Sequence, residues 1–229
     1  MTTITLPTYI CKLPSTGKNI NFRPFTVKEE KNLLLALEEN DINVVAEALK
    51  TIITNCTSSK VDVDTIPYYD MEFLFLQIRS KSVGELIDLI GSCDCSETAK
   101  TEFTVDIGTA VVNPKPSGTL KMKVPDTNYN MELRHPSLSD FILAFSNKAE
   151  SGTNTVARCI KTVYTDDEVF DWDFDKKVEF LDSMSPKQQK DIEKFLKDMP
   201  AVSIDSSYKC CKCGKEHKQA LSGFENFFV

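Results

Sequence analysis

Two short cysteine clusters, each flanked by stretches with the alternating pattern of β-strands, constrain the fold of this chain more than any other feature. The first reads CDC at residues 93–95, and the second reads KCCKCGK at residues 209–215. In a zinc knuckle, two thiolates spaced C-x-x-C come from the ends of a tight turn, and a following glycine adopts the positive φ that the turn requires. Cys210, Cys213 and Gly214 fit this description. Structural zinc takes four ligands, so the second cluster needs a partner, and the first is the natural candidate.

The sequence leaves two structural interpretations of these clusters open. One is a metal site that joins them. The other is a metal-free ribbon that keeps only the shape of a zinc hairpin, because the C-x-C spacing of the first cluster lacks the usual turn length and no glycine follows it. Cys211 is expected to point away from the site, since neighbouring side chains on a strand project to opposite faces. The candidate zinc ligands are Cys93, Cys95, Cys210 and Cys213, with His217 as a substitute.

A redox or nucleophilic role, carried by Cys213, is a third interpretation. A catalytic thiol needs a nearby base and a lowered pKa. His135 precedes Pro136, where we expect a surface position, and His217 fits a metal ligand or an exposed side chain better than a base. A thioredoxin-like C-x-x-C opens a helix, whereas this one lies between strands. The sequence also contains no phosphate loop, zincin helix or nucleophile elbow, so we predict no catalytic residues and no enzyme.

The remaining patterns predict an α+β fold, in which a small helical cluster is combined with antiparallel β-hairpins. Alternating residues around a Pro-Ser-Thr-Gly turn predict a hairpin within residues 8–25. Thr26 and Glu29 form a capping box that begins a helix, an apolar stripe at helical spacing follows over 45–56, and a further helix follows Pro67.

From Glu85 onward the apolar period changes to two, which is typical of strands. Hairpins are expected at 85–107, 119–134 and 201–220, and the first and last of these form a zinc-ribbon-like pair. Helices are expected at 137–145, 155–164, 175–184 and 186–199, and Ser222 with Glu225 is expected to cap a short C-terminal helix.

These elements divide the chain into four expected regions. They are an N-terminal hairpin and helical region (1–84), a β-hairpin region with the first cysteine cluster (85–136), a helical region (137–200), and a C-terminal cysteine knuckle with a short helix (201–229). The last region is expected to pack on residues 85–107.

Composition narrows the functional class. No run of about 18 apolar residues occurs, and Met1–Leu6 lacks the basic start and apolar stretch of a signal peptide, so we expect folding in a reducing cytosol and no membrane partner. The eight cysteines are unevenly spaced, and Cys11, Cys56 and Cys159 fit buried core positions. A net charge of −7 argues against a general nucleic-acid binder and favours protein partners.

Aromatic side chains are the candidate partner-binding residues. Residues 165–175 alternate acids with aromatic side chains without matching a calcium loop, and they fit an acidic docking or surface segment. The C-terminal phenylalanines either meet a partner or pack on their own domain. The residues concerned are Trp172, Phe224, Phe227 and Phe228.

Three stretches of the chain resemble one known family. They read LPSTGKNINFRPFTVKEEKNLLLALE (13–38), FLFLQIRSKSVGELIDL (73–89) and KCCKCGKEHKQALSGFENFF (209–228). In this order they resemble the baseplate hub assembly family of T-even-like contractile-tailed bacteriophages, over nearly the whole chain. Members of that family tend to carry C-x-x-C in both strand pairs, and the C-x-C at 93–95 departs from this pattern.

The resemblance implies a non-enzymatic role in building the hub of the tail baseplate, as a hub subunit or an assembly chaperone. The implied partners are other baseplate hub proteins, met in the host cytoplasm during assembly or in the virion, with no small-molecule substrate. A zinc-ribbon adaptor that binds nucleic acid is the second hypothesis. Its contacts would be Lys209, Lys212, Lys215 and Lys218.

Overall fold

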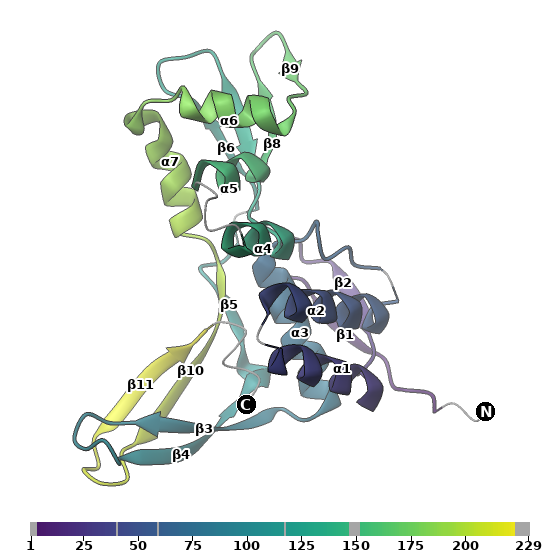
Figure 1. Cartoon of the computed structure of the whole chain (residues 1–229), viewed down its shortest axis with the longest axis vertical. Coiled ribbons are helices and arrows are strands. Elements are labelled where there is room, and N and C mark those ends of the chain that lie inside the picture. Colours follow the sequence, from purple (N-terminus) through teal and green to yellow (C-terminus); the bar gives the residue numbers. More distant parts are fainter. Residues whose placement is uncertain (1–3, 40, 59, 117, 147–151, 223–229) are drawn as a thin grey trace.

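The computed structural model of the chain describes residues 4–39, 41–58, 60–116, 118–146 and 152–222. Over these residues the fold is α+β, as expected from the sequence, with helices and small antiparallel sheets. Figure 1 shows a unit of blue and purple elements near the N-terminus and a second, green unit above it. Two long β-ribbons, one teal and one yellow, extend from the lower part of the molecule and converge at their tips.

The N-terminal unit is a hairpin packed against helices. Its elements are β1 (Tyr9–Lys12), β2 (Asn19–Phe22), α1 (Val27–Glu38), α2 (Ile42–Cys56) and α3 (Tyr68–Ser82). The predicted capping box begins α1: the Thr26 N–H donates to the Glu29 carboxylate at 2.7 Å, and the Glu29 N–H donates to the Thr26 hydroxyl at 3.4 Å. Cys11 and Cys56 are buried in the core of this unit, as predicted. The hairpin and the beginning of α1 therefore follow from local sequence signals.

Helix α3 connects this unit to the ribbons. One side of α3 contributes Leu74 and Phe75 to the N-terminal core, and another contributes Tyr69 and Leu76 to a second buried cluster with residues of both ribbons. The ribbon elements are β3 (Leu86–Ser92), β4 (Lys100–Asp106), the 3-10 turn η1 (Ile107–Thr109), β5 (Val111–Asn113), β10 (Ala201–Lys209) and β11 (Glu216–Leu221). β3 pairs only with β4 in the described residues, whereas β10 pairs with β5 near its start and with β11 beyond it.

The upper unit packs helices on a small sheet. The sheet order is β6-β7-β8-β9, antiparallel throughout. Its elements are β6 (Leu120–Lys123), β7 (Asn130–Leu133), α4 (Leu138–Ser146), α5 (Gly152–Cys159), β8 (Ile160–Tyr164), β9 (Val169–Phe170), α6 (Phe174–Asp182) and α7 (Pro186–Lys197). Cys159 is buried in this core, as predicted from its apolar stripe.

The predicted helix at 155–164 is wrong in its second half. Helix α5 ends at Cys159, and Ile160–Tyr164 forms strand β8 between β7 and β9. This stretch contains β-branched Ile160, Thr162 and Val163, which favour strands. Pairing with strands on both sides decides the structure, and a helical stripe in the sequence alone does not reveal that pairing.

The expectations for His135 and for the C-terminal helix can now be compared with the structure. His135 is not on the surface: it is 3% exposed, its ring stacks on Phe195 with centroids 4.3 Å apart, and it meets the ring of Tyr69 edge-on. The helix expected after Ser222 lies outside the described residues. Within the described residues, no helix combines the length and the apolar character that crossing a bilayer requires.

Candidate metal centre

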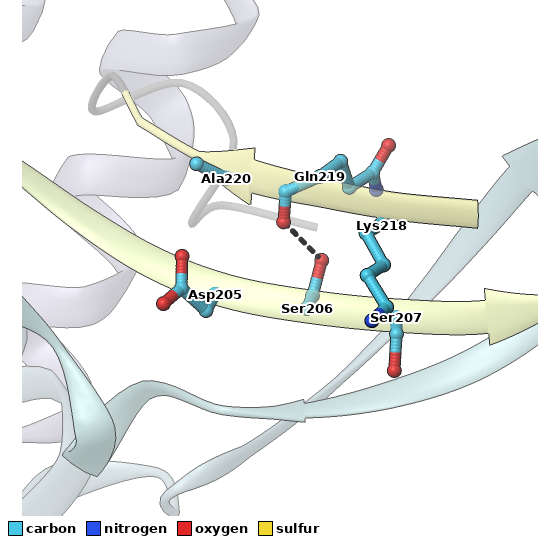
Figure 2. A pocket seen from close by; sticks show the side chains of 6 residues that line it. All are labelled: Asp205, Ser206, Ser207, Lys218, Gln219 and Ala220. Atoms are coloured by element: carbon cyan, nitrogen blue, oxygen red, sulfur yellow. Dashed lines mark hydrogen bonds between the residues drawn. The ribbon is translucent and has the colours of Figure 1, made fainter.

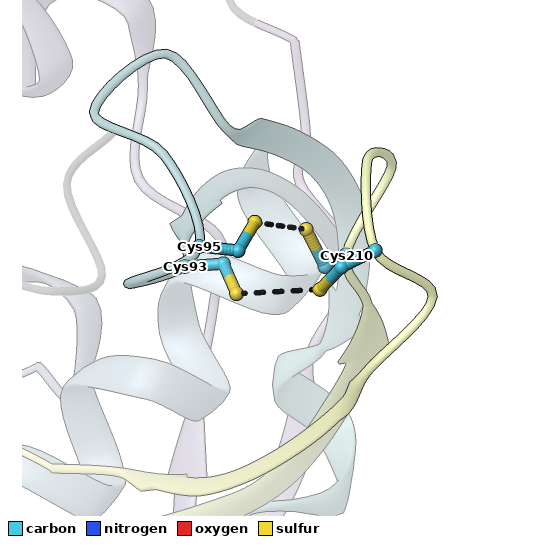
Figure 3. Close-up of side chains that lie close together, drawn as sticks. Cys93, Cys95 and Cys210 are labelled. Carbon is cyan, nitrogen blue, oxygen red and sulfur yellow. Dashed lines mark hydrogen bonds between the residues drawn. The ribbon is translucent and has the colours of Figure 1, made fainter.

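The cysteine clusters lie where the two ribbons meet. Strand β3 ends at Ser92 and strand β10 ends at Lys209, so Cys93 and Cys210 are each the first residue after a strand. The two turns that follow face each other at the converging ribbon tips (Figures 1 and 3). Each ribbon thus supplies one cysteine-bearing turn to a single site.

The C-terminal turn has the geometry predicted for a knuckle. The Gly214 N–H donates to the Cys210 carbonyl at 2.9 Å, and the Cys210 N–H donates to the Lys215 carbonyl at 2.9 Å. Gly214 has a φ of 71°, in the left-handed region that glycine enters without steric penalty. The Lys212 N–H also points at the Cys210 sulfur, at 3.4 Å.

The first turn forms without the usual spacing. The Ser96 N–H donates to the Cys93 carbonyl at 3.3 Å, and the Ala99 N–H donates to the Ser96 carbonyl at 2.9 Å. The turn is therefore closed by residues after Cys95, and no positive-φ glycine is needed next to the cysteines. The C-x-C spacing, which weakened the zinc interpretation at the level of sequence, still directs two sulfurs to one place.

The four sulfurs form one compact group. Cys93 Sγ lies 3.7 Å from Cys213 Sγ, and Cys95 Sγ lies 3.6 Å from Cys210 Sγ; both pairs cross from one ribbon to the other (Figure 3). All four Sγ atoms lie within 4.8 Å of one another. Cys93 and Cys210 are buried with Ala99, whereas Cys95 and Cys213 are exposed. These cysteines are free thiols that could together hold a metal ion.

Neighbouring groups shift the pKa values of Cys210 and Cys95 in opposite directions. Backbone N–H groups of Cys213 and Lys212 lower the pKa of Cys210 to about 6. The pKa of Cys95 is raised to about 12, first by its hydrogen bond with the Cys93 thiol, and the charge of Cys210 adds to this shift. A thiolate therefore forms easily at Cys210 and helps to hold the proton on Cys95, whereas a nearby cation would favour the loss of that proton.

The other cluster residues lie outside the sulfur group. The Cys211 N–H donates to the Thr101 hydroxyl at 3.0 Å, and the Cys211 thiol donates to the Lys100 carbonyl at 3.2 Å. His217 is paired with Tyr208 across the ribbon and stacks on its ring at 4.9 Å. The structure therefore brings the four predicted cysteines together and places the substitute ligand His217 against an aromatic ring.

An aromatic contact near the tips was not identified from the sequence. The Tyr208 ring of β10 stacks on Phe103 of β4, with centroids 4.7 Å apart, and its hydroxyl donates to the Ser92 carbonyl of β3. The signal available in the sequence was Gly91, since a glycine inside a strand pattern often marks a close approach by another group. Lys212 adds a further contact between the ribbons by donating to the hydroxyls of Ser96 and Thr98.

Of the aromatic residues expected to bind partners, the structure describes Trp172 alone. Trp172 is half-buried in a group of rings with Tyr129, Phe170 and Phe180, at centroid distances of 4.9 to 6.1 Å. Its ring therefore anchors the acidic segment to the upper core. Phe224, Phe227 and Phe228 lie outside the described residues.

Two surface hollows formed by described residues lack the groups of a thiol enzyme. One, of about 500 Å³, lies on the β10–β11 ribbon and is lined by Asp205, Ser206, Ser207, Lys218, Gln219 and Ala220 (Figure 2). Another, of about 460 Å³, has His135 and Phe195 in its lining but no cysteine. Within the described residues, no hydrogen bond joins a thiol to an imidazole.

Comparison with known proteins identifies a family and a relative. The family described as T4 bacteriophage base plate protein matches residues 6–229. The baseplate hub assembly protein gp26 of Enterobacteria phage T4 is 25% identical over 220 residues, which are 93% of this chain and 93% of that protein. No solved structure matches the chain.

Proposed function

This chain belongs to the family of T4 bacteriophage base plate proteins, and from that premise we propose that it acts in baseplate hub assembly by binding other hub proteins non-covalently. The observation that carries this proposal is the match over 93% of both chains to a protein named for baseplate hub assembly. Since the match covers 93% of each chain, the proposed role applies to the chain as a whole and not to one module of it.

The surface supports a role based on binding. On β3, Leu86 and Ile90 are 67% and 66% exposed, and their even spacing places them on the same face of the ribbon. On α1, Leu34 and Leu35 are also exposed. Single exposed apolar side chains are ordinary, but groups of them are typical of surfaces that meet a partner.

The same proposal assigns the cysteine centre a scaffolding role. Its thiols meet across two ribbons, and among the described residues the group contains no imidazole, which supports a part in shaping a surface. As a hub subunit, the chain would stay with its partners. As an assembly chaperone, it would bind one partner conformation better than another and so shift the population toward the assembling form.

The charges at the ribbon tips weigh against the nucleic-acid hypothesis. Residues 93–102 and 209–218 together contain five lysines, which are offset by the acids Asp94, Glu97, Glu102 and Glu216. Lys212, one of the proposed phosphate contacts, is already bonded to two hydroxyls of the other ribbon. Phosphate binding depends on a local excess of positive charge, and these tips have little excess.

Co-purification tests the proposed function. The chain carries an affinity tag and is co-expressed with the hub proteins of its own phage, and the bound proteins are identified by mass spectrometry. We expect at least one hub protein to co-elute in a fixed ratio that survives moderate salt. The proposal would be contradicted if every hub protein is soluble and none of them appears in the eluate. Measuring the chain in purified virions then separates a subunit, present in fixed copy number, from an assembly factor, which is absent.

A further inference from the structure

The geometry points to a structural zinc site: Cys93, Cys95, Cys210 and Cys213 bind one Zn²⁺ through four thiolates, and the ion holds the two β-ribbons together. The site is inferred from side-chain positions, so it stands or falls independently of the proposed role in hub assembly.

The sulfur spacing fits a tetrahedral metal ion better than a disulfide. With Zn–S bonds of about 2.3 Å, the edges of a tetrahedron of sulfurs are about 3.8 Å long. The two cross-ribbon separations here are 3.7 and 3.6 Å. A disulfide would need about 2.05 Å, so the sulfurs stand near the spacing that an ion between them would impose.

The ligand chemistry selects the metal. The site offers four soft sulfur atoms, and among the described residues neither a carboxylate nor an imidazole belongs to the group. Thiolates favour zinc or iron over magnesium and calcium, and four cysteines filling all four positions of a tetrahedron are typical of structural zinc. No position is left for a substrate or water, so the site is expected to be structural.

Proton and charge balance are compatible with this site. Each thiol gives up its proton to solvent as its Zn–S bond forms, and no oxidant or reductant is required. One Zn²⁺ with four thiolates carries a charge of about −2. Lys212 at the junction and the Lys212 N–H directed at Cys210 Sγ lie where they can offset this negative charge.

The ion would cross-link distant parts of the chain. It would join turns separated by 115 to 120 residues. Two-stranded ribbons are marginally stable by themselves, so the ribbon tips depend on the metal cross-link more than the helical units do. The N-terminal and upper units have large buried clusters of their own. Loss of the ion should therefore loosen the ribbon tips and leave these units folded.

Metal analysis of the purified chain tests the inference. We expect one zinc per chain by elemental analysis, and a fall of at least tenfold in Cys95→Ser and in Cys210→Ser. Cys211→Ser is the matched control, because Cys211 lies in the same turn but outside the sulfur group, and it should keep its zinc. Iron in place of zinc, no metal from zinc-supplemented cells, equal loss in the control, or intact Cys93–Cys213 and Cys95–Cys210 disulfides would each overturn the assignment.

Two measurements on the unaltered chain remove the risk that a variant simply fails to fold. Replacing zinc by Co²⁺ should give the intense thiolate-to-cobalt absorption of a tetrahedral sulfur site, and a spectrum of octahedral cobalt would overturn the inference. After chelation, hydrogen exchange should quicken at least tenfold in β3, β4, β10 and β11, while amides of α2 and α3 keep their protection. Equal protection with and without the metal would overturn the inference that the ion cross-links the ribbons.

Discussion

The ring of Tyr208 lies directly over the backbone of Gly91, so close that a Cβ built on Gly91 would come within 2.3 Å of Tyr208 Cζ and 2.6 Å of both Cε atoms. Gly91 belongs to β3 and Tyr208 to β10, so this contact joins the two ribbons next to the sulfur group. A side chain at position 91 would push the Tyr208 ring away from β3, and strand β10 would move with the ring.

Gly91→Ala should therefore loosen the junction of the ribbons. The ring cannot simply swing aside, because it is stacked between Phe103 and His217. We expect a loss of about 1–3 kcal/mol in local stability, the usual range for overpacking. Hydrogen exchange of the β3 and β10 amides measures this loss.

Gly152→Ala is the control for that experiment. A Cβ at Gly152 meets no atom of the described residues within 4 Å, and the residue begins a helix, where alanine is favourable. Its ribbon amides should exchange as in the unaltered chain. Equal exchange in Gly91→Ala and Gly152→Ala would show that the ring contact does not hold the ribbons.

Glu29 should stabilise the N-terminal unit in a pH-dependent way. Hydrogen bonds from the Arg23 guanidinium and from Thr26 lower the pKa of Glu29 from 4.5 to about 2. The folded state therefore holds the ionised carboxylate more firmly than the unfolded state does. Its contribution is complete above about pH 4.5 and is lost as the pH falls toward 2. Glu29→Gln should lower the free energy of unfolding by about 2 kcal/mol at pH 7, which allows for the partly exposed Arg23.

Urea unfolding at several pH values measures this effect. The difference between the unaltered chain and Glu29→Gln should be constant from pH 7 to 5 and shrink between pH 4.5 and 2. Glu38→Gln, at the exposed end of the same helix, should change the free energy of unfolding by less than about 0.5 kcal/mol. A difference for Glu29→Gln that stays the same at pH 3 would contradict the assigned role of its carboxylate.

His135 should make the folded chain sensitive to mild acid. Burial lowers its pKa, and neither ring nitrogen has a hydrogen-bond partner among the residues that the structure describes. Below about pH 6.5 the unfolded chain takes up a proton that the folded chain resists, so stability falls as the pH drops. His135→Phe keeps the ring between Tyr69 and Phe195, and it should be at least as stable at pH 7.

The measurement is the free energy of unfolding from pH 7 to 5. Relative to its value at pH 7, the unaltered chain should lose up to about 2 kcal/mol more than His135→Phe by pH 5. Parallel curves for the two proteins would show that His135 does not resist protonation in the folded state.

Local signals in the sequence predicted much of the fold. The capping box at Thr26 needs only four residues, and so does the start of α7, where the Ser185 N–H donates to the Gln188 side chain at 2.8 Å. Hairpins with turn residues between alternating stretches were also predicted, as at β1–β2 and β3–β4. In each case the residues that determine the element lie within it or beside it.

Structure that depends on distant partners was harder to predict. Strand β8 was expected as a helix because Ile160 and Val163 stand three residues apart, which is a helical spacing. Its pairing with β7, which includes a register shift, and with β9 makes it a strand instead. His135 was expected on the surface, because the residues beside it in the sequence do not indicate that Tyr69 and Phe195 pack against its ring.

The candidate metal centre falls between these cases. The sequence named these four cysteines as one possible site across two hairpins and left a metal-free ribbon open, and the structure brings their sulfurs together. The way in which C-x-C still forms a turn was not, because it depends on Ser96 bonding back to Cys93. The fit of Tyr208 over Gly91 is a contact between residues more than 100 positions apart, which no local pattern contains.

The most direct test of the central claim is sedimentation velocity of purified hub proteins of the same phage, with and without this chain. If the chain works by binding, one equivalent should move those proteins into a larger, defined complex, and no small molecule should be consumed. An unchanged sedimentation profile at micromolar concentrations, with every component folded, would contradict the account.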